Sequence, residues 1–107
     1  MFLTIENTIF NKDTIVMIEN DDDLLVHFID GNIVKFKESY FDEFRKYFIN
    51  ISDYVLINPD FISYCRANKN SLEIGFLTGE IYKFEIPVGK VYEIQSILEN
   101  WDGMDKY

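Results

Sequence analysis

Apolar and polar residues alternate along two similar stretches of the chain. The stretches "LLVHFIDGNIVKF" and "LEIGFLTGEIYKF" each hold two apolar runs around a small polar residue and a glycine, at Asp30-Gly31 and Thr78-Gly79. Glycine takes up positive φ without steric cost, so this arrangement is typical of a β-hairpin. The period of two, clearest at Leu72, Ile74 and Phe76, predicts that one face of the hairpin is buried.

The two stretches also repeat each other. Leu24–Phe36 and Leu72–Phe84 are identical at six of thirteen positions with an offset of 48, and Asn11–Ile15 resembles Asn58–Ile62 with an offset of 47. We interpret the repeat as one unit of strand, hairpin and helix used twice, with convergent β-patterning as the alternative. A single hairpin with one helix buries its apolar face poorly, whereas two such units can cover each other or extend a common sheet.

Short segments rich in β-branched and aromatic residues predict further strands outside the hairpins. Polar stretches between them are expected to be loops, and Asn58-Pro59-Asp60 is a turn signal. The additional strands are predicted at Phe2–Glu6, Ile9-Phe10, Thr14–Ile18, Val55–Ile57 and Phe61–Arg66, with loops at Glu19–Asp23 and Ala67–Ser71.

An amphipathic helix is predicted after each hairpin. Ser39 is the expected N-cap of the first helix, and Asp42 three residues later approximates a capping box. Pro87 suits the first position of the second helix. Spacings of three and four define the apolar stripes, which are Tyr40, Phe41, Phe44, Tyr47 and Phe48 in the first helix and Val91, Ile94, Ile97, Leu98 and Trp101 in the second.

These elements predict a β-rich α+β fold of six to nine mostly antiparallel strands and two helices. A chain of 107 residues buries roughly two-thirds of its unfolded surface, and 48% of its residues are hydrophobic. We therefore expect a single domain over residues 1–101, built from similar halves at about 9–50 and 55–101, with a frayed tail at 102–107.

The number of cysteines and the length of the apolar runs indicate the cellular compartment. Cys65 is the one cysteine, so no intrachain disulfide can form, which fits a reducing compartment. The start of the chain lacks the pattern of a signal peptide. The longest apolar runs are about four residues, far too short to span a membrane. The sequence predicts a cytoplasmic protein that does not enter a membrane.

The net charge of −9, from 19 acidic and ten basic residues, bears most directly on function. A DNA duplex carries one negative charge per ~1.7 Å of its axis, so an acidic domain is repelled unless its bases are clustered. The bases of this chain are scattered along the sequence. Acidity instead favours solubility and approach to a basic partner.

The order of the elements resembles the LytTR family, a DNA-binding output domain of bacterial response regulators. "DTIVMIE" (Asp13–Glu19) looks like its opening strand, "VHFIDGNIVKF" like its first hairpin, and "SYFDEFRKYF" like its helix. "YVLINPDFISYC" resembles the family's apolar segment with an Asn, and "LEIGFLTGEIYKFEIPVGKVYEI" its closing hairpin and helix. The resemblance covers most of the chain and implies a LytTR-like fold.

The chain departs from the family where DNA contacts are expected. The family places Arg, His and Ser at alternate positions before the Asn, and this chain has Asn50, Ser52 and Tyr54 there. Alternate strand positions share a face, so this face has no phosphate-binding charge. The residues left to carry DNA binding, as an alternative function, are Lys35, Lys37, Arg45, Lys46, Asn58, Arg66 and Lys69.

No catalytic or metal-binding motif is predicted. The acidic run Glu19–Asp23 lacks the glycine and the twelfth-position Glu of a calcium loop, so it is expected to be a solvated turn or a partner-facing tip. His27 is the single histidine, on a predicted strand, and Cys65 is expected to be a packed, inert thiol. We predict no enzyme activity, no metal and no cofactor.

The leading hypothesis is a non-enzymatic acidic protein that engages a positively charged protein partner. Small acidic proteins of bacteria or phages that work in this way include immunity proteins and nucleic-acid mimics, which act as inhibitors. The predicted partner-binding residues are Asp21, Asp22, Asp23, Asp30, Asp42 and Glu43. The alternatives are a divergent LytTR-like transcription regulator, for which nucleic acid would be the partner, and a structural subunit. The protein is expected to be a monomer or a homodimer, the latter pairing through exposed edge strands.

Overall fold

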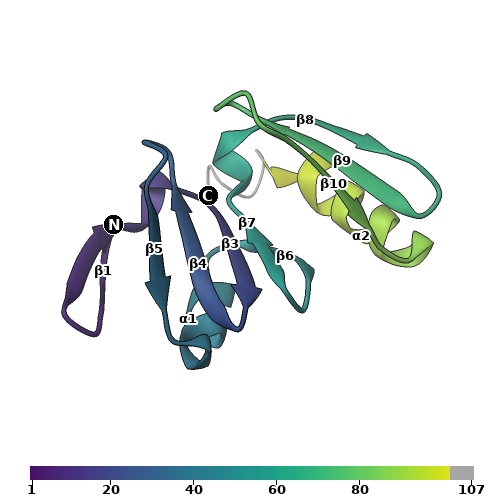
Figure 1. The fold of residues 1–107 in the computed structure, drawn as a ribbon. Helices are drawn as coiled ribbons and strands as arrows, with labels where there is room; N and C mark the ends of the chain where they lie inside the picture. The colour runs from purple at the N-terminus through teal and green to yellow at the C-terminus, as the bar shows by residue number, and fades with distance from the viewer. Residues whose placement is uncertain (102–107) are drawn as a thin grey trace. The chain divides into compact units, whose positions relative to one another are not determined.

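The computed structural model describes residues 1–101, which form ten strands and two α-helices (Figure 1). Met1–Asn58 forms one compact unit, and the described residues from Pro59 onward form a second. Neither helix of the described chain is long and apolar enough to cross a membrane. The prediction of a β-rich, antiparallel α+β fold is confirmed, with one strand more than the upper end of the expected range.

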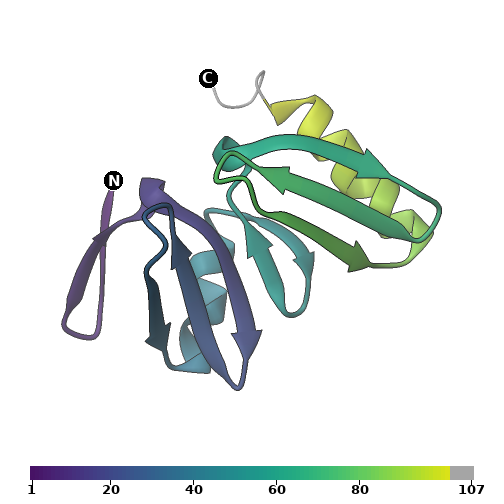
Figure 2. The same cartoon turned by 45° about the horizontal axis from the view of Figure 1, so that its top comes forward.

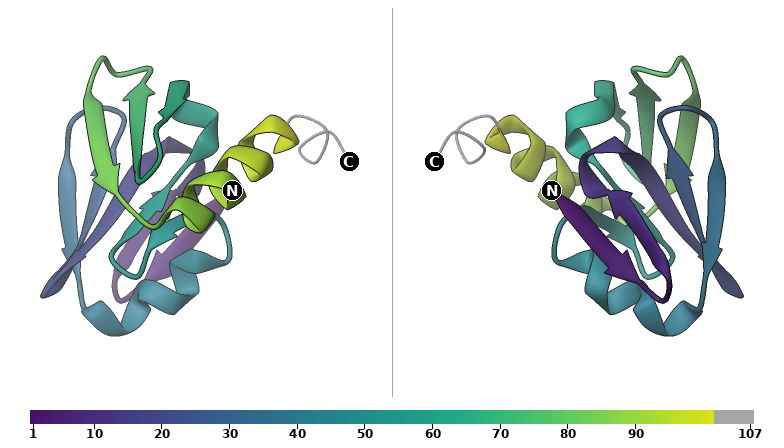
Figure 3. Two further views of the ribbon diagram at one scale, coloured as in Figure 1. Left: turned by 90° about the vertical axis from the view of Figure 1, so that its right-hand side faces the viewer. Right: turned by 90° about the vertical axis from the view of Figure 1, so that its left-hand side faces the viewer.

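The first unit contains two sheets, and all of their strand pairs are antiparallel. A hairpin of two strands stands at the start of the chain (Figure 3), and a five-stranded sheet follows in the order β5-β4-β3-β7-β6. The bounds are β1 Phe2–Ile5, β2 Thr8–Asn11, β3 Ile15–Asp21, β4 Asp23–Phe28, β5 Ile33–Phe36, β6 Ile49–Ser52 and β7 Val55–Ile57. Short 3₁₀ turns lie at Lys12–Thr14 and Glu38–Tyr40, and the helix α1 spans Phe41–Arg45.

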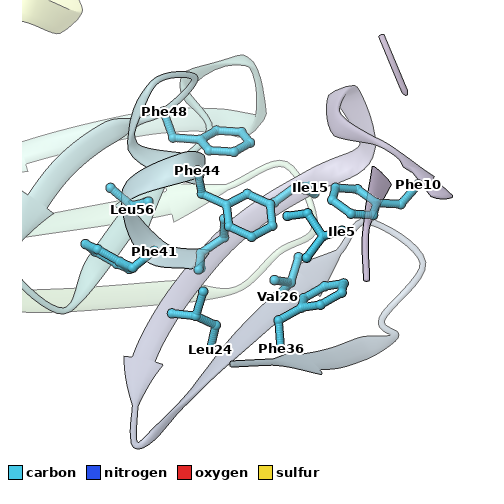
Figure 4. Close-up of a cluster of buried hydrophobic side chains, with 11 residues drawn as sticks. Ile5, Phe10, Ile15, Leu24, Val26, Phe36, Phe41, Phe44, Phe48 and Leu56 are labelled. Carbon is cyan, nitrogen blue, oxygen red and sulfur yellow. The ribbon is translucent and has the colours of Figure 1, made fainter. Parts of the chain in front are cut away.

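A cluster of aromatic and aliphatic side chains fills the space between the five-stranded sheet, α1 and the β1–β2 hairpin (Figure 4). Phe10 is central because its ring packs against three others, those of Phe28, Phe36 and Phe44, at centroid distances of 5.7–6.1 Å. Phe44 is fully buried. This packing fixes which face of the sheet α1 covers and leaves the strand ends free to carry polar groups.

The second unit is a three-stranded antiparallel sheet in the order β10-β9-β8, with one helix across one face (Figures 1 and 2). Leu72, Ile74 and Ile94 are fully buried between the sheet and the helix. The bounds are β8 Ile62–Ala67, β9 Ser71–Phe76, β10 Ile81–Glu85 and α2 Val88–Glu99, after a 3₁₀ turn at Pro59–Phe61.

The sequence repeat corresponds to a repeat of backbone hydrogen bonds. In the first hairpin the amides of Phe28 and Gly31 donate to Asn32 O and Phe28 O, and the second hairpin has the same bonds 48 residues later. Both glycines take positive φ, 90° at Gly31 and 94° at Gly79. Each hairpin is thus closed by the same turn, which explains why the chain keeps a glycine at this point in both copies.

The repeat extends to the strand that precedes each hairpin. A 3₁₀ turn leads into β3 and another into β8, and each strand shows a register shift directly after its start, between Ile15 and Met17 and between Ile62 and Tyr64. The two units therefore use the same sequence of turn, bulged strand, hairpin and helix. That the two form a single domain over residues 1–101 stays a prediction, and the predicted tail at 102–107 lies outside the described residues.

Several predicted boundaries were wrong in instructive ways. The expected loop Glu19–Asp23 is almost entirely strand, because β3 and β4 continue until Asp22 alone separates them. Ser39 lies within a 3₁₀ turn, and the residue before α1 is Tyr40, whose side chain makes no cap hydrogen bond. Pro87 is the N-cap of α2, one position before its first residue.

The outer face of the second sheet carries one close contact between an aromatic ring and a glycine. Tyr64 lies across Gly75, such that a Cβ atom on Gly75 would sit 2.1 Å from Tyr64 Cε1. The Tyr64 hydroxyl donates a hydrogen bond to Glu73 Oε2 at 3.0 Å, and this bond raises the pKa of the phenol. A side chain at position 75 would therefore displace the Tyr64 ring from this site.

We predict that Gly75→Ala lowers the free energy of unfolding by about 1–2 kcal/mol, because the Tyr64 ring must leave its site. Urea denaturation measures this. Gly89→Ala is the control, since a Cβ there meets nothing within 4 Å and alanine favours the helix by up to about 1 kcal/mol. If Gly75→Ala lowers the free energy of unfolding by the same amount in a Tyr64→Ala background as in the parent chain, the ring contact is not the cause.

Candidate partner-binding surface

The tip of the β3–β4 hairpin presents three consecutive carboxylates. Asp21 and Asp23 face each other as the last pair of the ladder, and Asp22 forms the turn between them with φ 64°. Aspartate tolerates this left-handed conformation better than most residues because its short polar side chain can bond locally. All three residues are exposed, so the turn holds three negative charges close together in solvent.

Two neighbouring segments bring further carboxylates to the same end of the sheet. The amide of Asn20 donates a hydrogen bond of 2.7 Å to Tyr54 O, which places the β6–β7 turn, with Asp53, beside the end of β3. One hollow of about 380 Å³ is lined by Glu19, Asn20, Asp21, Asp22, Tyr54 and Val55. Another of about 420 Å³ is lined by Asn20, Glu38, Ser39, Phe41 and Asp42. We call this region the acidic end and define it by Asp21, Asp22, Asp23, Glu38, Asp42 and Asp53.

Most carboxylates of the acidic end are not neutralised by a base. Among the described residues, Asp42 is paired with Arg45 at 3.2 Å, whereas the other five members have no ion pair within 4.0 Å. The nearest base along the chain is Lys37, which follows β5 and precedes Glu38. The acidic end is therefore a region of negative potential on the first unit.

The structure does not bring all of the predicted acidic residues together. Asp30 lies in the β4–β5 turn, at the opposite end of β4, where its carboxylate accepts hydrogen bonds from the amide and the side chain of Asn32. Glu43 is on α1, paired with Lys46 at 3.2 Å, and lines neither hollow. Sequence analysis missed Glu38 and Asp53, whose proximity to Asp21 depends on the strand order.

The basic residues of the first unit do not gather on one side of it. Lys35 alternates along β5 with Val34 and Phe36, which pack in the core, so it lies on the sheet face opposite α1. Arg45 is the last residue of α1 and Lys46 is its C-cap, and each is paired with an acid. In the second unit, Lys69 lies in the β8–β9 loop, and the guanidinium of Arg66 lies 5.9 Å from the Tyr64 ring centroid and 4.0 Å from Glu73.

The positions that carry the family's basic residues are neutral and take part in local structure. Ser52 Oγ accepts a hydrogen bond of 3.1 Å from the amide of Tyr54. Asn50 Oδ1 is buried without a hydrogen-bond partner among the described residues. Tyr54 is 65% exposed at the rim of the acidic end. This edge of the sheet offers a polar and aromatic surface with no positive charge.

Asn58 has a structural role, because its hydrogen bonds join two strands. Its side chain is 5% exposed, and its Nδ2 donates a hydrogen bond of 2.8 Å to Ile15 O, while its backbone amide donates to Val16 O. These bonds fasten the end of β7 to the start of β3. DNA contact by Asn58 stays a prediction, and its burial leaves little surface for it.

His27 and Cys65 are side chains of types that often act in catalysis, but neither is placed for it here. His27 Nε2 on β4 lies 2.7 Å from Glu19 Oε1 on β3, which is the distance of an ion pair for a protonated ring, yet the nitrogen makes no well-aligned hydrogen bond. Cys65 is half-buried, and burial raises the pKa of its thiol, which makes it a poor nucleophile. Within residues 1–101 no group of three His, Cys, Asp or Glu side chains could hold a metal ion.

We predict that Asn58→Ala lowers the free energy of unfolding by about 1–3 kcal/mol, because a buried carbonyl loses its partner. Urea denaturation of this variant and of Asn68→Ala, at an exposed position, gives the comparison. If both variants are as stable as the parent chain, Asn58 does not fasten β7 to β3 in the way described.

Comparison with known proteins places the architecture. No protein-family model and no curated protein sequence matches the chain. Among solved structures, it is similar to the LytTr DNA-binding domain of a putative methyl-accepting/DNA response regulator from Bacillus cereus, with a TM-score of 0.64 and 12% identity over 92% of this chain and 94% of that domain. At this level of identity the likeness concerns the fold alone. The resemblance seen in the sequence is confirmed as a LytTR-like fold.

Proposed function

We propose that this protein is a non-enzymatic binding protein that engages a positively charged protein partner through the acidic end. The observation that carries the proposal is the gathering of six carboxylates from three segments of the first unit, five of them without an ion pair among the described residues. A partner's Lys and Arg side chains would supply the missing counter-charges.

The physical basis is electrostatic complementarity. Opposite charges on two surfaces speed their encounter and favour the correct partner, and the effect weakens as salt rises. Tyr54, 65% exposed at the rim, offers an aromatic face to a guanidinium or ammonium group, to which rings are attracted. The acidic end thus supplies both the charge and a flat ring for a basic surface.

The more specific form of the proposal is inhibition. Nucleic-acid-binding proteins hold phosphates with Lys and Arg side chains. Carboxylates projecting from a rigid hairpin tip and two adjacent segments would occupy such a groove in place of phosphates. A protein of this kind acts as a nucleic-acid mimic or as an immunity protein, depending on whether its target is a regulator or a toxin.

We predict that the triple variant Asp21→Lys, Asp22→Lys and Asp23→Lys loses its partner. The measurement is affinity capture from a lysate of the native host, with mass spectrometry, at low and at raised salt. The parent chain is expected to retain a basic protein that is released as salt rises.

The matched control reverses three exposed acids of the second unit, Glu80, Glu85 and Glu93, to Lys. It changes the net charge by the same amount without touching the acidic end, and it should retain the partner. Equal capture by the parent chain and both variants would rule out the acidic end as the binding surface, and equal loss in both variants would indicate a net-charge effect only.

A second function, DNA binding, is favoured by one observation, the fold shared with a LytTr DNA-binding domain. It would rely on Lys35, Lys37, Arg45, Lys46, Asn58, Arg66 and Lys69. Of the bases in this set, Arg45, Lys46 and Arg66 are each within 4.0 Å of an acid. Affinity from so few phosphate contacts would be low and strongly dependent on salt.

Filter binding of a duplex at low salt separates the two functions. We predict no retention of duplex by the parent chain at micromolar protein, because net charge −9 opposes the phosphates. Retention with a steep salt slope, lost when Lys35 and Lys37 are changed to Ala, would favour the DNA-binding function over the acidic binder.

A further inference from the structure

The second unit contains a hollow of about 350 Å³ between β8 and the C-terminal half of α2. This volume lies in the range of small-molecule sites, roughly 300–1,000 Å³. Its lining comes from the start of the unit and both of these elements, namely Pro59, Ile62, Cys65, Ala67, Gln95, Leu98, Glu99 and Trp101. It belongs to none of the surfaces discussed above, since the acidic end lies wholly in the first unit.

The hollow combines an apolar wall with a few polar groups. Ile62, Leu98 and Trp101 are among its apolar lining residues, while Gln95 and Glu99 contribute an amide and a carboxylate. Such a combination is typical of sites in which apolar area provides affinity and a small number of polar groups fixes orientation.

One polar group in this wall has no hydrogen-bond partner among residues 1–101. Trp101 Nε1 is buried and makes no hydrogen bond within the part of the chain that the structure describes. A buried N–H without an acceptor is costly, and a ligand that supplies an acceptor recovers that cost. The carboxylate of Glu99, one helical turn from Gln95 along α2, favours a cationic group beside it.

We propose that this hollow binds a small aromatic amine without covalent attachment. The ring would lie on Ile62 and Leu98, the ammonium group would face Glu99, and the hydrogen-bond acceptor for Trp101 would come from a polar substituent of the ring. Cys65 lines the wall but forms no bond with the ligand, because an amine has no electrophilic centre that a thiol could attack.

Two side chains that line the hollow can report ligand binding directly. The chain contains one tryptophan and one cysteine, and both line the hollow. A bound molecule therefore changes the emission of Trp101 and slows alkylation of Cys65 by iodoacetamide. A molecule that binds elsewhere on the protein changes neither in a saturable way.

The test uses the 4-methoxy derivatives of three molecules of nearly equal shape, 2-phenylethylamine, 2-phenylethanol and phenylacetate, so that every probe carries the same ring acceptor for Trp101. We expect the amine to give a saturable change of Trp101 emission at millimolar concentration and to protect Cys65. The alcohol should bind roughly threefold more weakly, the difference expected for an exposed ion pair, and phenylacetate more weakly still. Glu99→Gln should remove the preference for the amine and leave the binding of the alcohol unchanged.

A variant that fills the hollow tests whether the probes bind there. Ala67→Phe adds a ring at an exposed position of the lining and should abolish both signals, whereas Asn68→Phe, the next residue along, should preserve them. Circular dichroism confirms that both variants fold. The proposal is overturned if no probe gives a saturable response, if Ala67→Phe binds like the parent chain, or if phenylacetate binds most tightly.

Discussion

Like charges held at short distance repel, and the first unit holds five unpaired carboxylates at one end of its sheet. The repulsion is not relieved by the unit's own bases, because Arg45 and Lys46 are paired locally at the end of α1 and Lys35 lies on another face. We propose that a cationic partner relieves this repulsion.

A LytTR-like fold does not by itself establish what the chain binds. A fold is set by apolar pattern and turn geometry, whereas a ligand is selected by the chemistry of particular surface positions. In this chain the turns include the repeated glycine turn, and the strands that precede the hairpins are bulged. The strand positions at which the family carries positive charge hold Asn50, Ser52 and Tyr54 instead.

Sequence reasoning succeeded where local chemistry decides the structure. The hairpins at Gly31 and Gly79 could be predicted because positive φ favours glycine, and the repeat could be recognised because both units need the same turn. Sequence reasoning failed where a strand continued through a run of polar residues. Asp21 and Asp23 look like loop residues by composition, yet tertiary pairing keeps them in the ladder up to a turn of one residue.

The candidate surface was predictable only in part, for a topological reason. The run Asp21–Asp23 is visible as a charge cluster in the sequence. The contribution of Asp53 depends on β7 pairing with β3, and that of Glu38 on the path from β5 to α1. Asp30 was grouped with them because of its charge, but it lies in the turn between β4 and β5, which is at the other end of the sheet.

The most direct test of the central claim is an NMR titration of the labelled protein with an oligo-arginine peptide, followed through the backbone amides. Complementary charge at the acidic end predicts shift changes concentrated at residues 19–23, 38–42 and 53–55, which fade as salt screens the interaction. Changes spread evenly over the acids of both units, or centred on the second unit, would contradict the assignment of the acidic end as the binding surface.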